Sequence, residues 1–348
     1  MKILITGHQG YIGPAMIETF KKAGHEVTGL DIGYFRACTV KGRHVPGPDR
    51  EIVRDIREAT AADFSGMDAV VHLSALSNDP MGALDPELTY DINLRASLRA
   101  AELAKQAGVQ RFIFASSCSI YGAAGNSQTP LDETAPFNPV SAYAVSKVKT
   151  EEGLRALADD SFSPVYLRNS TAYGVSARTR LDIVLNNLMA CAHATGEIRV
   201  LSDGTPWRPL VHIEDISGAA LAAAEAPREA VHNQAFNIGR NDANYQVRDI
   251  AEAVKRFVPE AELVITGETG GDTRSYRVDF SKALTALPGF APKWTLEDGA
   301  RELDQWFREG ALEGEEGYQS RRFVRLKQLR HLLDTAAVDG TLHPLRPL

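Results

Sequence analysis

The stretch MKILITGHQGYIGPAM (residues 1–16) decides the fold of this chain. It opens with a short β-branched and aliphatic run, Lys2–Thr6, which is typical of a buried parallel strand. Apolar residues then recur at helical spacing over 11–22. Between the strand and the helix stand three glycines at intervals of three, Gly7, Gly10 and Gly13. Free backbone N–H groups and the dipole of a helix N-terminus favour an anionic group there, such as a pyrophosphate.

An acidic residue ends the next strand candidate. The run HEVTGLDI (25–32) places Asp31 about twenty residues beyond the glycines, where a carboxylate meets the adenosine ribose in a dinucleotide fold. It would accept hydrogen bonds from the 2′-hydroxyl and repel a 2′-phosphate. Each feature alone also fits an ordinary turn, since glycine tolerates positive φ. Together they predict a dinucleotide site that takes NAD rather than NADP.

Composition and charge exclude several classes of protein. With 348 residues, 44% of them hydrophobic, the chain is long enough for one large domain or two intimate ones. A net charge of −7 argues against a nucleic-acid surface, and no apolar run approaches the roughly twenty residues that span a bilayer. Cys38, Cys118 and Cys191 are scattered without metal-type spacing, so we expect no metal. The start carries no signal-peptide pattern, and we expect a cytoplasmic protein.

Strand and helix patterns alternate through the first half of the chain. Strand candidates lie at 51–56, 68–75, 110–117 and 163–170, and helical stretches lie at 86–107 and 142–157. Such alternation predicts an α/β fold, a Rossmann-like doubly wound parallel sheet with helices on both faces. Ligands of this fold lie at the carboxyl ends of the strands.

After about Tyr173 the rhythm changes, and a smaller, interleaved α/β substrate-binding lobe is expected. Its helical stretches lie near 183–194, 247–257 and 296–307. The expected division is 1–172 for the NAD-binding domain, 173–207 and 240–310 for the lobe, and 311–348 for a helical tail. Within 208–239, the strand candidates RPLVHI (208–213) and QAFNIG (234–239) are expected to return to the main sheet.

The tail contains SRRFVRLKQLRHLL (320–333), with a helical apolar stripe between basic residues. We expect a terminal helix docked on the body, with its basic face in solvent. A subunit contact is the alternative, and a membrane-surface helix is less consistent with an acidic chain.

Candidate catalytic residues follow the fifth strand. Tyr143 and Lys147 are four apart in a predicted helix, so both side chains lie on one face. A free tyrosine has a pKa near 10, and a nearby ammonium would stabilise its phenolate. Such a pair can take a proton from a substrate alcohol while a hydride leaves the same carbon. Ser117, at the carboxyl end of the strand, would hydrogen-bond the reacting oxygen.

Together these motifs resemble the extended short-chain dehydrogenase/reductase family, and within it the NAD-dependent nucleotide-sugar epimerases and dehydratases. The motifs are the glycine triplet, Asp31, Asp55, Asn93, Ser117, Tyr143 and Lys147. The resemblance runs from Met1 to about Gly310 and leaves the tail outside. It implies NAD as cofactor, a nucleotide-diphosphate sugar as substrate and a homodimer.

The family pattern assigns further residues by position. On the cofactor side it implies Gly7, Gly10, Tyr11, Ile12, Gly13, Asp31, Asp55, Ile56, Leu73, Ala75, Asn93, Tyr143 and Lys147. On the substrate side it implies Ser117, Asn169, Asn187, Leu188, Arg208, Asp272 and Tyr276. In this pattern Arg208 pairs with the sugar-nucleotide phosphates, a role that suits the planar guanidinium fork. Tyr276 aligns with a position where a bulky residue excludes N-acetylated sugars.

Departures from the pattern narrow the reaction. Where 4,6-dehydratases carry acidic residues after the catalytic hydroxyl residue, this chain has Cys118 and Ser119. The cysteine of 3,5-epimerases would stand at Ser119, one residue away from Cys118, and on a strand that shift reverses the face. The arginine expected three residues before Asp272 is Thr269. This last departure leaves the nucleotide open: UDP is the first choice, and GDP, CDP and dTDP are the alternatives.

The sequence thus favours an NAD-dependent nucleotide-sugar 4-epimerase that acts through a transient 4-keto-sugar. The alternative is a one-way oxidoreductase or 4-ketoreductase with the same Ser-Tyr-Lys site, which would change the net amount of NADH. A catalytically silent NAD-sensing protein fits less well, because such proteins typically lose the tyrosine or the lysine and this chain keeps both.

Overall fold

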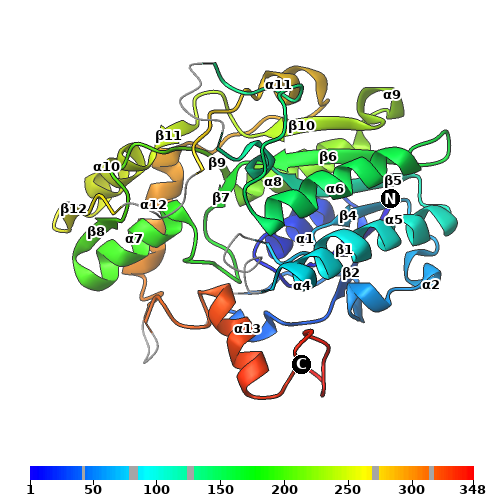
Figure 1. The fold of residues 1–348 in the computed structure, drawn as a ribbon, viewed down its shortest axis with the longest axis horizontal. Helices are drawn as coiled ribbons and strands as arrows, with labels where there is room; N and C mark the ends of the chain where they lie inside the picture. The colour runs from blue at the N-terminus through cyan, green and yellow to red at the C-terminus, as the bar shows by residue number, and fades with distance from the viewer. Residues whose placement is uncertain (41–43, 78–84, 124–128, 269–273, 313–316) are drawn as a thin grey trace.

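The computed structural model describes residues 1–40, 44–77, 85–123, 129–268, 274–312 and 317–348. Seven parallel strands form its main sheet (Figure 1). In spatial order they are β10 (Gln234–Ile238), β6 (Ser163–Asn169), β5 (Arg111–Ser117), β4 (Ala69–His72), β1 (Lys2–Thr6), β2 (Glu26–Asp31) and β3 (Arg50–Val53). The predicted Rossmann-like parallel sheet is confirmed.

Helices cover both faces of this sheet because its strands alternate apolar side chains between two cores. Ile3 and Ile5 of β1 pack with α1 (Gly13–Lys22) and α8 (Ile213–Glu225) on one face. Leu4 points the other way, into the core with α5 (Ala96–Gln106). The same second core receives Leu154 of α6 (Ala142–Leu157).

One of the two strands expected to return to the main sheet does so, and the other does not. β10 pairs with β6 at the sheet edge. The strand from RPLVHI, β9 (Trp207–His212), instead lies between β7 (Thr171–Tyr173) and β11 (Asn244–Gln246) in a separate three-stranded sheet. That part of the expectation is wrong, because two apolar runs of equal quality cannot be told apart without knowing which edge is already paired.

A second lobe lies beside the main sheet, on the left of Figure 1. It comprises α7 (Val184–Thr195), β8 (Glu197–Val200), α10 (Val247–Phe257), β12 (Glu262–Ile265) and α12 (Leu296–Arg308). One apolar cluster joins these elements, with Leu185, Val254 and Leu303 among its fully buried members. The predicted helices are present; the domain boundaries drawn around them stay a prediction.

The long helical stretch predicted at 86–107 is three segments. They are α4 (Pro86–Tyr90), a π-helical turn (Asp91–Arg95) and α5. Asn93 stands in the π-turn and ties down the main chain of Leu76, accepting from its N–H at 2.8 Å and donating to its carbonyl at 3.1 Å. The hydroxyl of Thr150 donates to the carbonyl of Asn93, so the altered turn leaves that group satisfied.

The C-terminal tail docks on the body as expected. Its helix α13 (Arg325–Asp334) and the residues after it lie below the main sheet in Figure 1. Leu329, Val338 and Leu342 share a buried apolar cluster with Tyr34 and Ile92. This "tail cluster" joins the tail to the loops after β2 and β4. Within the described ranges, no helix has the length and apolar character needed to cross a membrane.

Short elements complete the chain. They are the 3₁₀ turns η1 (Arg36–Cys38), η2 (Ile56–Glu58) and η4 (Cys118–Tyr121), and the short helices α2 (Ala61–Phe64), α9 (Arg228–Val231) and α11 (Ser281–Ala286).

A buried ion pair joins α6 to β6. Glu151 is fully buried, and the guanidinium of Arg168 donates to both its carboxylate oxygens, at 3.1 and 2.8 Å. The hydroxyl of Ser116, in β5, donates to the same carboxylate at 2.6 Å. A buried pair of this kind leaves a costly unpaired charge when only one partner is removed.

We therefore expect Arg168→Met to lower the free energy of unfolding by about 3–5 kcal/mol. Urea denaturation measures this. Arg256→Ala is the control, because its ion pair with Glu297 is exposed and such pairs contribute less than about 1 kcal/mol. The double variant Glu151→Leu/Arg168→Met should recover part of the loss. A single variant as stable as the control would contradict the argument.

Candidate active site

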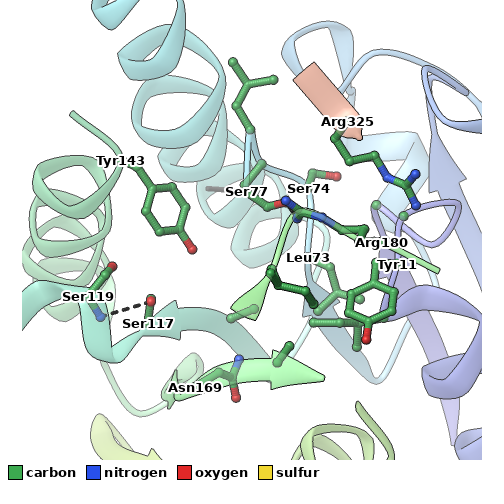
Figure 2. A pocket seen from close by; sticks show the side chains of 18 of the residues that line it. Tyr11, Leu73, Ser74, Ser77, Ser117, Ser119, Tyr143, Asn169, Arg180 and Arg325 are labelled. Atoms are coloured by element: carbon green, nitrogen blue, oxygen red, sulfur yellow. Dashed lines mark hydrogen bonds between the residues drawn. The ribbon is translucent and has the colours of Figure 1, made fainter. Parts of the chain in front are cut away.

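A cavity of about 660 Å³ lies at the carboxyl ends of the main-sheet strands. Residues that follow β1, β2, β3, β4, β5 and β6 all contribute to its lining. Figure 2 shows Tyr143, Ser117 and Ser119 on one side of it, and Tyr11, Arg180 and Arg325 on the other. The position is the one expected for a ligand of a doubly wound sheet.

Two of the three glycines hold the first loop against its neighbours. Gly7 has φ of +73°, and a Cβ there would stand 2.7 Å from the backbone nitrogen of Ser74. A Cβ on Gly13 would stand 1.9 Å from the carbonyl oxygen of His8. Side chains are therefore excluded at both, and the loop leads directly into the N-terminus of α1. This is a cradle into which a diphosphate fits.

Acidic residues line the cavity where β2 and β3 end. The carboxylate of Asp31 is fixed by the N–H groups of Gln9 at 2.9 Å and Gly33 at 2.7 Å. Asp55 is buried, lines the cavity beside Ile56, and is bound by the guanidinium of Arg57. A carboxylate in this position fits the adenosine ribose that the sequence analysis assigns to Asp31, and that assignment stays a prediction.

The candidate catalytic residues come together at the other end. Ser141 caps α6 by accepting from the N–H of Ala144, so the helix starts at Ala142 and carries Tyr143 in its first turn. Ser117, Tyr143 and Lys147 all line the cavity. The Lys147 ammonium lies 5.6 Å from the centre of the Tyr143 ring.

Two of these side chains have defined partners. The Ser117 hydroxyl oxygen accepts from the N–H of Ser119 at 3.1 Å (Figure 2), which leaves its hydrogen available for a ligand. The Lys147 ammonium donates to the carbonyl of Ala115 at 2.7 Å. Burial lowers the pKa of Lys147 to about 7, while the charge of Glu151 opposes that shift.

Most of the expected binding residues line the cavity. They are Gly7, Gly10, Tyr11, Ile12, Gly13, Asp31, Asp55, Ile56, Leu73, Ala75, Asn169, Arg208 and Tyr276, in addition to the catalytic three. The Oδ1 atom of Asn169 is buried without a hydrogen-bond partner. Asp272 lies outside the described residues.

Three expected residues do not line the cavity. Asn93 acts at a distance, by holding the main chain of Leu76, which does line it. The side chain of Asn187 donates to the carbonyl of Leu181. Leu188 is buried in the core of the second lobe. In the structure Asn187 therefore has a local hydrogen-bonding role and Leu188 a packing role, and neither lines the cavity.

Several residues that line the cavity were not assigned to it by the sequence analysis, and three of them carry polar groups of interest. Ser119 is 3% exposed, and its Oγ has no hydrogen-bond partner. Arg180 pairs with Asp182 through two hydrogen bonds of 2.8 and 3.1 Å. Arg325 comes from the tail. No local signal separated these arginines from surface charges, because only the fold brings them to the cavity.

Fold and cavity together define an α/β protein of the dinucleotide-binding type. A model of the NAD dependent epimerase/dehydratase family matches residues 3–239, and the chain belongs to that family. NAD as cofactor is thereby confirmed.

Three known proteins illustrate the relationship. The chain is 28% identical to a UDP-glucose 4-epimerase of Neisseria meningitidis serogroup C over 320 residues, 82% of this chain and 91% of the relative. The structure of TunA, an NAD-dependent NDP-hexosamine 5,6-dehydratase, matches with a TM-score of 0.78 and 25% identity over 88% of this chain and 98% of that one. The structure of MoeE5 in complex with UDP-glucuronic acid and NAD matches with a TM-score of 0.76 and 25% identity, over 89% of this chain and 100% of that one. The expected homodimer is not tested by a single chain and stays a prediction.

The pKa of Lys147 predicts a pH-dependent stability. An unfolded lysine titrates near 10.4, whereas the buried one titrates at about 7. Between these values the unfolded state binds more protons, so the free energy of unfolding should rise with pH. Urea denaturation of nucleotide-free wild type and Lys147→Met, at pH 7, 8 and 9, isolates this contribution. The free energy of unfolding of the wild type should rise with pH relative to that of the variant. If the two free energies changed in parallel with pH, the lowered pKa of Lys147 would be contradicted.

Proposed function

We propose that this protein is an NAD-dependent nucleotide-sugar 4-epimerase that acts through a transient 4-keto-sugar. The observation that carries the proposal is that Tyr143 and Lys147, on one face of α6, line the cavity together with Ser117 at the end of β5, whereas Asp31 stands at the end of β2, three strands along the sheet. The likeness to UDP-glucose 4-epimerases along most of the chain also supports the proposal.

Tyr143 is the proposed acid–base. Its phenolic oxygen takes the proton of the sugar's C4 hydroxyl and later returns it to the 4-keto oxygen. The Ser117 hydroxyl donates to that reacting oxygen, since its own oxygen already accepts from Ser119. Lys147 supplies positive charge beside the Tyr143 ring. Bound NAD supplies the hydride acceptor and donor for C4.

Substrate diphosphate is proposed to bind at the lobe side of the cavity. Arg208 lines the cavity there, together with Arg274 and Tyr276. Its guanidinium donates to the carbonyls of Trp207 and Arg274, which fixes the planar group in one orientation. Holding the diphosphate while the sugar turns over would present both faces of the keto-sugar to the same hydride donor. UDP is the first choice of nucleotide, as in the named relatives.

The cavity chemistry favours epimerisation over dehydration. Cys118, in the place of an acidic dehydratase residue, is fully buried, and its thiol donates to the carbonyl of Arg168. Burial raises the pKa of Cys118 to about 12. Neither it nor the Ser119 hydroxyl is a carboxylic acid that could protonate a leaving hydroxyl at neutral pH. A one-way oxidoreductase is separated from an epimerase by measuring net NADH, which only the oxidoreductase changes.

Tyr143→Phe tests the mechanism. The change removes one oxygen and keeps the ring, so the fold and NAD binding should survive while turnover falls by about 10²–10⁴-fold. Single-turnover reduction of bound NAD, followed by absorbance with UDP-glucose, measures the loss. Thermal shift with NAD serves as the binding control. Turnover within a few-fold of wild type would refute the role of Tyr143.

Arg208→Gln tests the proposed diphosphate contact. Charge-assisted hydrogen bonds contribute roughly 1.5–3 kcal/mol, so UDP should bind about 10- to 100-fold more weakly while NAD affinity changes little. Titration calorimetry with UDP and with NAD measures both. Arg248→Gln, an exposed arginine near β11, is the control. If NAD affinity fell and UDP affinity did not, Arg208 would belong to the cofactor instead.

A further inference from the structure

The tail contributes a charged side chain to the cofactor cavity. Arg325 is the first residue of α13 and is 1% exposed, yet it lines the cavity. Figure 2 shows it on the same side as Tyr11 and Arg180, away from Tyr143. It lies beyond residues 3–239, the part of the chain that matches the family.

The hydrogen bonds of Arg325 go to the main chain. Its guanidinium donates to the carbonyls of Arg322 and Arg178, and it lies 5.1 Å from the centre of the Phe35 ring. Within the described part of the chain it forms no ion pair with a carboxylate. Burial lowers the pKa of Arg325, because a desolvated cation without a carboxylate partner is disfavoured.

Neighbouring arginines add to the positive charge. Arg178 is 7% exposed, and its Nε is buried without a hydrogen-bond partner. Arg180 is paired with Asp182, whose carboxylate also accepts from the backbone N–H of Arg325 at 3.4 Å. We call Arg178, Arg180 and Arg325 the arginine cluster. Of these three, Arg180 and Arg325 line the cavity, and the guanidinium of Arg325 donates to main-chain carbonyls, so an anion bound in the cavity would offset the desolvation cost of that buried cation.

The position of Arg325 selects which anion this is. Figure 2 shows Arg325 on the same side of the cavity as Tyr11 of the glycine loop, and its guanidinium lies over the ring of Phe35, a cavity residue in the loop that follows Asp31. Arg325 therefore stands between the glycine loop and the ribose end of the cavity. In NAD the group between the adenosine ribose and the nicotinamide ribose is the diphosphate.

We propose that Arg325 binds the diphosphate of NAD, so that the C-terminal tail completes the cofactor site of this protein. Further contacts hold the tail there. Gln328 donates to the carbonyl of Tyr34, and Arg57, which binds Asp55, donates to the carbonyl of Thr341 at 2.7 Å. The tail is thus held against the segments that follow β2 and β3. The proposal rests on NAD binding by the family and not on the proposed epimerase reaction.

Ligand titrations on nucleotide-free protein test the proposal. Arg325→Gln should weaken NAD and ADP by about 10- to 100-fold, as expected for loss of a charge-assisted hydrogen bond. The affinity for adenosine, which has no phosphate, should change by less than about threefold. Arg325→Lys keeps the charge, and its affinity for ADP should lie between those of the wild type and Arg325→Gln. Arg330→Gln, exposed on the same helix, is the matched control and should bind all three as wild type does.

Several outcomes would overturn it. Unchanged ADP affinity in Arg325→Gln would do so, and so would equal losses for ADP and adenosine, which would mean that the tail only supports the wall. A loss for UDP without a loss for ADP would assign the arginine to the substrate. If Arg325→Gln does not fold, as judged by circular dichroism, Arg325→Lys decides: wild-type ADP affinity then refutes the proposal, and a loss of threefold or more with adenosine unchanged supports it. If Tyr143→Phe kept its turnover, the proposed epimerase mechanism would fail, but these binding results would stand, because they measure affinity for ADP and NAD and not catalysis.

Discussion

The buried pair of Glu151 and Arg168 is the interaction on which the arrangement of the active site depends. Arg168 immediately precedes Asn169 at the cavity end of β6, and Glu151 stands one turn after Lys147 in α6. Ser116, which also binds the carboxylate, immediately precedes Ser117. A single buried charge pair therefore sets the relative positions of two strand ends and one helix. A hydrophobic replacement would fill the space without fixing that register.

The cavity is divided into two chemical environments by this architecture. At one end, the backbone N–H groups of the glycine loop and the guanidinium groups of Arg180 and Arg325 are the groups that we propose bind phosphates. At the other, hydroxyls and an ammonium of lowered pKa face the place where a proton would move. Both ends are built on the carboxyl edge of one sheet, so the sheet fixes the positions of the binding residues relative to the candidate catalytic residues.

Much of the fold could be predicted because its signals are local. The strand Lys2–Thr6 and the helices Ala142–Leu157 and Val247–Phe257 were predicted with the bounds that the structure has. Tyr143 and Lys147 were found for the same reason, since their spacing on one helix carries the signal. The edge chosen by β9 and the burial of Leu188 depend on tertiary pairing, which no window of sequence contains. Arg325 was harder still to predict, because it lines the same cavity as Gly7 although more than 300 residues separate the two in the sequence.

The tail cluster has a consequence for how this protein could be shortened. Tyr34, Leu76, Leu88 and Ile92 are buried largely in company with Leu329, Leu332 and Leu342. A chain that ended at Gly310, where the family resemblance ends, would keep every candidate catalytic side chain but leave that apolar group facing water. Contiguous apolar surface of this kind promotes self-association of otherwise folded molecules. Residues 311–348 therefore act as a solubility element, and we expect a chain without them to be recovered as aggregate.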